Sequence, residues 1–232
     1  MPGIATWAAL AVPAAAYASS TLLPLPGIFD AASGTAVWRV RPTEIALTFD
    51  DGPDPMRTPK ILDALGRAGA RATFFVIGSR VKQCAAIVRR IINEGHVVGN
   101  HTIDHASLVW RREAFVEGAL SRAQEKIFDV CGVLPKIVRP PFGRRDATFY
   151  RVAARLQLTP VFWSRDTFDW LGVPAMLVAS RLGSARNGDI VLMHDGAPRA
   201  TGTLAGLEAG LARLSRDKRA PRPCVIATAA AS

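Results

Sequence analysis

Residues 44–53 read EIALTFDDGP, and they are the most informative stretch of this 232-residue chain. A short, largely apolar run, typical of a buried strand, ends here in two adjacent carboxylates, Asp50 and Asp51, before a Gly-Pro turn. Short runs of β-branched or aromatic character recur further along the chain, and each predicts a strand. With 44–49 as the first, the others cover residues 72–77, 96–99, 136–139, 159–163, 189–193 and 223–228.

Amphipathic helical patterns separate these runs. The clearest begins at Thr58-Pro59, where a capping residue is followed by proline at the first helical position, and Ile61, Leu62 and Leu65 then recur at helical spacing. Further helices are expected near 80–94, 113–130, 146–156, 174–186 and 202–216. Near-continuous apolar strands that alternate with helices favour a parallel sheet covered by helices.

Polar functional groups gather just beyond the ends of different predicted strands. The motifs that contain them are TFDDGP (48–53), HTIDH (101–105), RPPFG (139–143), WSRDTFDW (163–170) and IVLMHDG (190–196). Closed (β/α) barrels collect their active sites at the carboxyl ends of the strands. The seven predicted strands therefore favour a (β/α) barrel, and a doubly wound open sheet is the alternative.

The HTIDH motif predicts a pair of metal ligands. His101 and His105 stand four residues apart, so two imidazoles can share one face of a short helix or turn. Zinc and similar ions accept neutral imidazole and carboxylate ligands, and catalytic sites leave one position open. Either Asp50 or Asp51 can supply the third ligand while the other carboxylate faces the open position. Each feature alone is more often a surface coincidence or a turn, but their joint occurrence favours a catalytic metal site.

Two further charged groups are candidates for catalysis. His194 closes an apolar strand, where partial burial and a carboxylate partner would tune its pKa, and Asp166 is the expected partner. Arg139 ends another strand before two prolines, and its guanidinium could hold Asp50 ionised. The alternatives without a catalytic role are a histidine satisfied in the core for His194 and a solvated side chain for Arg139. His96 is expected to be structural.

In order and residue type, the five motifs resemble those of the NodB-homology polysaccharide deacetylases, carbohydrate esterase family 4, from about Trp38 to near the C-terminus. The resemblance implies a distorted (β/α)7 barrel. It also implies that Asp50 is the general base and that Asp51, His101 and His105 hold a divalent metal. Zinc is the expected ion, with cobalt or another divalent ion as the alternative.

The same resemblance implies the other roles in the site. Arg139 orients Asp50, His194 is the general acid with Asp166 beside it, and a backbone N–H near Phe142 stabilises the oxyanion. Tyrosine is common in the family where Phe142 stands, and a main-chain donor makes this difference unimportant. Candidates for contacts with the substrate, including the apolar wall around an acetyl methyl, are Phe142, Trp163, Trp170 and Leu192.

These roles together predict a hydrolase that removes N-acetyl groups from N-acetylglucosamine-containing glycans, such as peptidoglycan or chitooligosaccharides, and releases acetate. An O-acetyl esterase acting on a polysaccharide such as xylan would use the same groups. A catalytically inactive glycan-binding protein is the third possibility. Intact Asp50, Arg139 and His194 argue against it, because a binding protein need not keep both a base and an acid.

The N-terminal part differs in composition from the rest. We expect a catalytic domain over 38–232, preceded by an apolar segment and linker over 1–37. Residues 1–29 carry no charged side chain, which fits a membrane anchor, a signal peptide without a basic start, or a segment packed on the barrel. We expect an exported or membrane-anchored protein of the cell envelope, in which residues 4–29 would associate with the membrane. Arg39 and Arg41 argue against export under the positive-inside rule, so a cytoplasmic location is the alternative.

The formal charge of +10 arises mostly from arginines spread over the predicted helices. No nucleic-acid-binding motif accompanies them, so we expect an acidic envelope surface as partner, or a solubilising role, and no nucleic acid. Three cysteines form an odd set without metal-binding spacing and are expected to pack as small apolar residues. The oligomeric state does not follow from the sequence.

Overall fold

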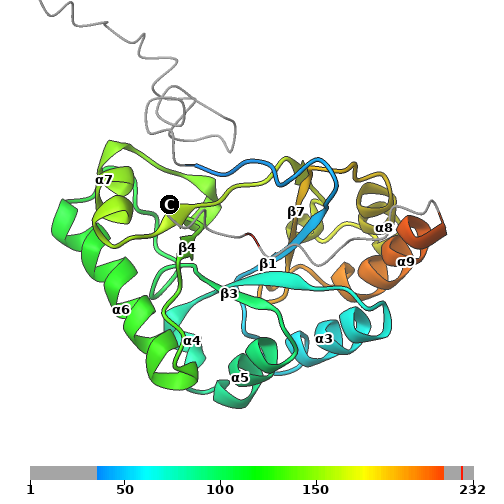
Figure 1. The fold of residues 1–232 in the computed structure, drawn as a ribbon, viewed down its shortest axis with the longest axis horizontal. Coiled ribbons are helices and arrows are strands. Elements are labelled where there is room, and N and C mark those ends of the chain that lie inside the picture. The colour runs from blue at the N-terminus through cyan, green and yellow to red at the C-terminus, as the bar shows by residue number, and fades with distance from the viewer. Residues whose placement is uncertain (1–35, 217–225, 227–232) are drawn as a thin grey trace, which may run out of the picture.

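The computed structural model describes residues 36–216 and residue 226. Seven strands, each parallel to its neighbours, form one curled sheet in the order β5-β4-β3-β2-β1-β7-β6 (Figure 1). The strands are β1 (Ala46–Asp50), β2 (Ala72–Val76), β3 (Val97–Asn100), β4 (Ile137–Val138), β5 (Thr159–Pro160), β6 (Arg165–Asp166) and β7 (Ile190–His194). Consecutive strands are neighbours from β1 to β5 and from β6 to β7, and β7 lies beside β1, which is the order of a barrel that stays open between β5 and β6. The distorted (β/α)7 barrel is therefore confirmed, and the doubly wound sheet is excluded.

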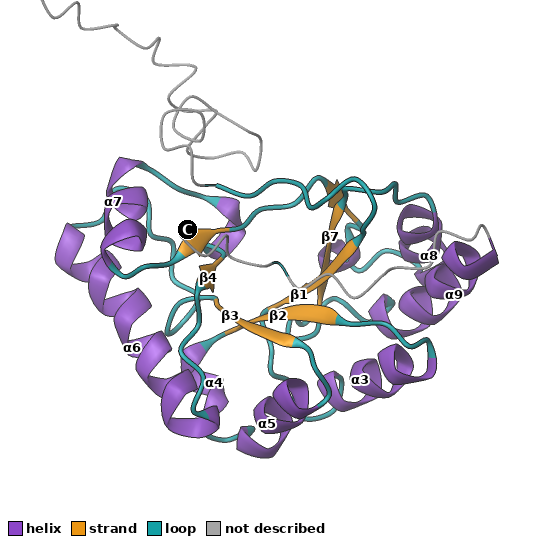
Figure 2. Ribbon diagram, viewed as in Figure 1, coloured by secondary structure: helices purple, strands orange, loops and turns teal. Residues whose placement is uncertain are grey.

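Helices cover the outer face of the sheet (Figure 2). They are α3 (Thr58–Arg67), α4 (Gly78–Val81), α5 (Ala85–Asn93), α6 (Glu113–Cys131), α7 (Ala147–Arg155), α8 (Ala175–Gly183) and α9 (Thr203–Arg216), with 3-10 turns η1 (Pro141–Gly143) and η2 (Asp169–Leu171). The single helix expected near 80–94 is wrong, because α4 and α5 are separate. The first two amides of α4, from Gly78 and Ser79, donate to the carbonyls of Thr102 and Ile103, which ties α4 to the loop after β3.

The alternation of side chains along β1 separates the packed layer from the site. Ile45, Leu47 and Phe49 lie in the large core between the sheet and its helices. Ala46 belongs to a smaller cluster with Phe75, Ile137, Val161 and Ile190 inside the barrel. Thr48 and Asp50 continue this inner row toward the carboxyl end of the strand. The polar end of β1 therefore lies above the apolar cluster inside the barrel.

The strand content differs from the expectation at two places. β6 was not expected, and it is only two residues long. The run at 223–228 lies outside the described residues except for Ile226, which is buried in the inner cluster and is not part of a strand. The count of seven therefore holds with a different seventh strand.

The segment 36–40 spans the gap between β5 and β6. Val37 forms a parallel bridge with Val161, and Arg39 forms an antiparallel bridge with Asp189. Trp38 stacks on Phe162, with 4.5 Å between the ring centroids. In Figure 1 this blue segment crosses the side of the barrel between α7 and α8. The described fold thus includes residues just before the expected domain start at 38.

The expected anchor, signal or packed segment in residues 1–29 lies outside the described residues. Within 36–216, no helix combines the length and the apolar character that crossing a bilayer would need. Cys84 and Cys131 are free thiols, and Cys131 packs against the main core.

Candidate active site

Three potential metal ligands meet above the ends of β1 and β3. The Oδ1 atom of Asp51 lies 3.3 Å from Nε2 of His101 and 3.0 Å from Nε2 of His105. One ligand atom from each residue lies within 4.8 Å of the other two. The HTIDH segment is an irregular loop, in which the hydroxyl of Thr102 accepts from the His105 amide at 3.0 Å. A turn, and not one face of a helix, therefore brings His101 and His105 together.

The backbone and the second ring nitrogen of His101 orient this cluster. Asp51 and His105 adopt left-handed backbone conformations, with φ of 71° and 62°, which are costly for residues other than glycine and typical of functional sites. Nδ1 of His101 lies 2.7 Å from the carbonyl oxygen of Arg139 and must carry the proton that it donates. Nε2 of His101 faces Asp51, and in the neutral ring its lone pair is available to a metal ion.

The residues present fit a divalent ion. Asp51 Oδ1 is buried and has no hydrogen-bond partner among the described residues, although two imidazole nitrogens face it. Burial raises the pKa of Asp51, but His101 and His105 outweigh this effect and hold it below its ordinary value. An ionised carboxylate with two imidazoles is a ligand set that zinc and related ions accept.

Asp50 is held by a fully buried guanidinium. Nη1 of Arg139 donates to Asp50 Oδ1 at 2.8 Å, while its other nitrogens donate to the carbonyls of Val161 and Phe162 at 3.1 and 2.8 Å. Burial lowers the pKa of Arg139, and the charge of Asp50 opposes that shift. The other oxygen of Asp50 lies 3.9 Å from Nε2 of His101. Asp50 is thus fixed as an ion-paired carboxylate with one oxygen directed to the metal cluster.

His194, the last residue of β7, is positioned by Asp169. Its Nδ1 lies 2.8 Å from Asp169 Oδ1, and its backbone N–H donates to Asp169 Oδ2 at 2.8 Å. The hydroxyl of Thr203 donates to the same Oδ2 at 2.6 Å. Burial lowers the pKa of His194, but the hydrogen bond and charge of Asp169 outweigh it and raise the pKa to about 9. The ring is therefore protonated at neutral pH.

The expected pairing of Asp166 with His194 is wrong. Asp166 accepts from the amide of Phe168 at 2.7 Å and from Nε1 of Trp170 at 3.4 Å. Phe168 has a φ of 60°, which turns the chain after β6 so that η2 brings Asp169 beside β7. The motif contains two carboxylates three residues apart, and its spacing alone did not show which one faces the histidine.

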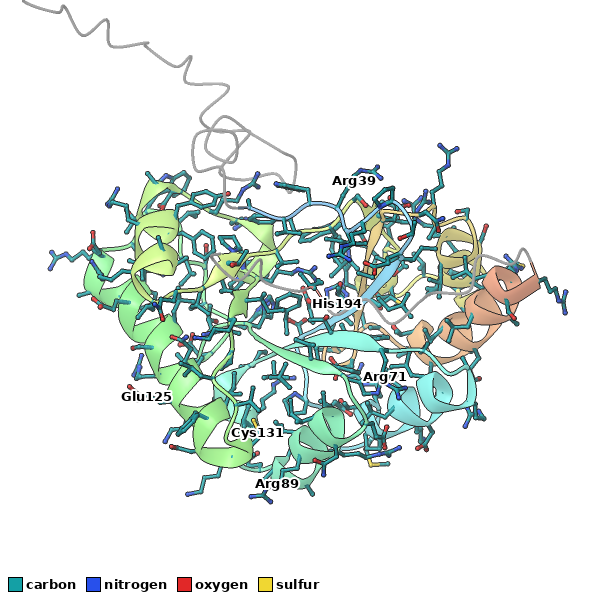
Figure 3. The ribbon with its side chains drawn as sticks, viewed as in Figure 1. Arg39, Arg71, Arg89, Glu125, Cys131 and His194 are labelled. Atoms are coloured by element: carbon teal, nitrogen blue, oxygen red, sulfur yellow. The ribbon has the colours of Figure 1, made fainter. Side chains whose placement is uncertain are left out.

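Asp50, the three potential metal ligands and His194 line one cleft of about 640 Å³. Its wall includes all four side chains expected to contact the substrate, and Asp166 lies there too. Leu192 is buried in the wall, whereas Phe142 and Trp170 are exposed and Trp163 is half-buried. In Figure 3, His194 lies at the centre of the molecule, inside the ring of helices.

Sequence reasoning missed several residues in or beside the cleft. Arg80 donates to the carbonyl of Asp51 at 2.6 Å, and the buried Asp195 accepts from the hydroxyl of Thr58 at 2.5 Å. Thr58 is therefore the first residue of α3 with its hydroxyl directed at Asp195, where a helix cap was expected. Asp195 could have been suspected because it follows His194 directly. The arginines of the cleft had no such signal, since arginines occur throughout the chain.

Known proteins are similar to this chain over more than half of its length. The sequence profile of the polysaccharide deacetylase family matches residues 39–161. A peptidoglycan-N-acetylglucosamine deacetylase of Bacillus cereus is 41% identical over 152 residues, which make up 65% of this chain and 55% of the relative. The chain thus spans about half the length of that protein.

Two further similarities cover more of the relative. A chitooligosaccharide deacetylase of Azorhizobium caulinodans is 39% identical over 159 residues, which make up 67% of this chain and 75% of the relative. The crystal structure of a peptidoglycan N-acetylglucosamine deacetylase aligns with a TM-score of 0.79 at 32% identity, covering 84% of this chain and 92% of the other.

Proposed function

Because this chain belongs to the polysaccharide deacetylase family, we propose that it is a metal-dependent hydrolase that removes N-acetyl groups from N-acetylglucosamine-containing glycans and releases acetate. The observation that carries the proposal is the convergence of three kinds of group on one cleft. These are an ion-paired carboxylate, a three-ligand cluster and a protonated imidazole. Amide hydrolysis requires a base, an electrophile and an acid in this arrangement.

Asp51, His101 and His105 would hold the metal, for which zinc is the expected ion. When bound, a divalent ion supplies Lewis-acid chemistry, which polarises an acetyl carbonyl and acidifies water. Asp50 is suited to accept the proton of the attacking water, because Arg139 pairs with it and fixes its direction. A backbone N–H near Phe142 is the proposed second stabiliser of the oxyanion.

His194 is suited to protonate the amine nitrogen as the carbon–nitrogen bond breaks. An amine leaves readily only after it has gained a proton, and Asp169 keeps the ring charged at neutral pH. An alkoxide leaving group depends less on this proton, so the raised pKa of His194 favours N-deacetylation over the O-acetyl esterase alternative. Leu192 and Trp163 form the apolar wall that would accommodate the acetyl methyl.

The relatives are named for peptidoglycan and for chitooligosaccharides, and both classes of glycan contain the required N-acetyl group. We infer a location in the cell envelope, reached by export or anchoring, because peptidoglycan lies there. An inactive glycan-binding protein is disfavoured, since both catalytic pairs are intact. Asp50 is paired with Arg139, and His194 is paired with Asp169.

The central test separates metal binding from turnover. The Asp50→Asn variant is expected to keep its metal and to lose acetate release by about 10²- to 10⁴-fold, the usual effect of removing a general base. The His101→Ala variant is expected to lose metal and activity together. Metal is measured by elemental analysis, and acetate release on chitooligosaccharide, peptidoglycan and acetylated xylan.

Glu125→Gln is the matched control, since Glu125 is exposed on α6 and lies at the periphery of the molecule (Figure 3). It is expected to match the wild type in both measurements. Undiminished turnover by Asp50→Asn would contradict the assignment of the base, and faster release from xylan than from either amide substrate would favour the esterase.

A further inference from the structure

Two cations on the rim of the cleft have no part in the proposed chemistry. Arg144 follows η1, and Arg199 lies in the loop after β7. Both side chains are exposed and line the cleft. Neither forms an ion pair with any residue in the described part of the chain. Arg90 and Arg155, by contrast, pair with neighbouring carboxylates on the helical surface. Two unpaired guanidinium groups at the entrance of a binding cleft are available for an anionic ligand.

Arg144 and Arg199 lie on different sides of the metal cluster. The guanidinium of Arg144 lies over the ring of Phe142, 5.4 Å from its centroid. The ring centroids of Phe142 and His105 are 4.7 Å apart. The carbonyl of Arg199 lies 3.5 Å from the position of a Cβ on Gly172, so this loop packs against η2. The strands that precede the two loops, β4 and β7, stand on opposite sides of β1 in the sheet.

Each side of the cleft thus combines an exposed aromatic ring with an arginine. The guanidinium of Arg144 lies over Phe142, and Trp170 belongs to η2, the turn against which the loop of Arg199 packs. Aromatic faces suit the apolar faces of sugar rings, and guanidinium groups suit carboxylates, which they bind through paired hydrogen bonds. Asp166, the remaining carboxylate of the cleft wall, accepts from Phe168 and Trp170 and forms no ion pair with Arg144 or Arg199.

We propose that Arg144 and Arg199 determine specificity by binding carboxylates carried on the two sides of the N-acetylglucosamine that is hydrolysed. The preferred substrate is then a glycan in which the target sugar alternates with carboxylate-bearing sugars, as in the lactyl-substituted strands of peptidoglycan. A neutral chitooligosaccharide offers these arginines no partner. This inference rests on the proposed deacetylase function and narrows its substrate class.

The test compares glycans that share the target sugar and differ in charge. The first is a peptide-free strand of alternating N-acetylglucosamine and lactyl-bearing sugar, and the second is the same strand with its lactyl carboxylates methyl-esterified. The third is a strand with peptide stems, whose carboxylates lie on the peptide, and the fourth is a chitooligosaccharide of equal length. The wild type is expected to show at least a tenfold higher kcat/KM on a carboxylate-bearing strand than on the esterified strand or the chitooligosaccharide.

Arg144→Gln and Arg199→Gln are each expected to lower kcat/KM about 5- to 10-fold on the preferred strand, mainly through KM, and to leave the chitooligosaccharide unchanged. A larger loss on the peptide-free strand assigns the contact to the lactyl carboxylate, and a larger loss on the stem-bearing strand assigns it to the peptide. Arg89→Gln makes the same charge change on α5, at the periphery of the molecule (Figure 3), and is expected to have no effect.

Dissociation constants of the same glycans, measured with the Asp50→Asn variant, give the same ranking without turnover. Equal losses on charged and neutral glycans, or no loss on any, would overturn the role of the two arginines. If acetate is released from the chitooligosaccharide but charge makes no difference, only this inference fails. If no glycan yields acetate, the proposed function fails, and the dissociation constants still decide whether the rim binds carboxylates.

Discussion

Two buried histidines, His194 and His96, have pKa values shifted in opposite directions. Burial lowers the pKa of both, but His194 faces the negative charge of Asp169 and its pKa rises to about 9. His96 lies near the positive charge of Arg71, and its pKa falls to about 4. Its Nδ1 accepts from the amide of Ala72 at 3.1 Å, which is the structural role expected from the sequence. One residue type is therefore charged in the cleft, where His194 is the proposed acid, and is a neutral acceptor in the core.

The pH profile of the enzyme tests the role of Asp169. His194 must be protonated to act as an acid, so activity is expected to fall as the pH rises through its pKa. Asp169→Asn removes the charge that raises this pKa while keeping a similar shape. The alkaline limb of kcat/KM against pH is expected to move to lower pH by one unit or more.

Asp166→Asn is the control for this shift, because Asp166 lies in the same motif and bonds elsewhere. Its alkaline limb is expected to remain near that of the wild type. An alkaline limb that stays at the wild-type pH in Asp169→Asn would show that Asp169 does not raise the pKa of His194. A larger shift in Asp166→Asn than in Asp169→Asn would show the same.

At the scale of secondary-structure elements, glycines determine how closely α9 approaches α8. The two helices lie side by side on one flank of the barrel (Figure 1). A Cβ on Gly206 would lie 2.5 Å from Cβ of Val178, and one on Gly210 would lie 2.6 Å from a methyl carbon of Leu182. The β-branched valine cannot move away, because its Cβ is fixed by its own backbone.

Gly206→Ala is therefore expected to lower the free energy of unfolding by about 1–3 kcal/mol, as overpacking of a well-filled contact does. Gly66→Ala is the matched control. Gly66 lies within α3 with open space around it, so alanine is expected to stabilise the protein by about 0.5–1 kcal/mol. Urea denaturation of both variants measures the two effects, and equal signs would refute this account of the contact.

At the scale of the whole molecule, the segment 36–40 connects the two edges of an incomplete barrel. Val37 bonds to β5 through the carbonyl of Pro160, and Arg39 forms an ion pair with Asp189, which lies just before β7. Trp38 packs on Phe162, whose carbonyl also accepts from Arg139, the arginine that pairs with Asp50. The closure of the barrel is thus coupled to the floor of the site.

Trp38→Ala is expected to lower the free energy of unfolding by about 3 kcal/mol, because it removes a large ring from this contact. Trp38→Phe keeps the stacking and also removes an indole N–H that is buried without a partner among the described residues, so we expect a loss below about 1 kcal/mol. Trp110→Ala, at an exposed ring, is the control and is expected to change stability by less than about 0.5 kcal/mol. Chemical denaturation followed by circular dichroism distinguishes these values.

Much of the fold could be predicted because its signals are local. Strands β1, β2, β3 and β7 lie within two residues of the expected runs, since each is a continuous apolar stretch that must be buried. β6 could not be predicted, because two residues with a polar composition carry no periodic pattern. The break between α4 and α5 depends on hydrogen bonds to the loop after β3, which is distant in the sequence.

The sequence by itself predicted that His101, His105 and one of the adjacent carboxylates Asp50 and Asp51 would meet, because each motif directly follows a strand and parallel strands end at one edge. It left open which carboxylate joins the histidines, and it offered Arg139 only as a candidate partner of Asp50. Only the tertiary structure decided that Asp169 holds His194 and that Arg144 and Arg199 line the cleft without an ion pair among the described residues. The physical reason is that a hydrogen bond or an unpaired charge depends on the path of the loops in space, which spacing along the chain does not encode.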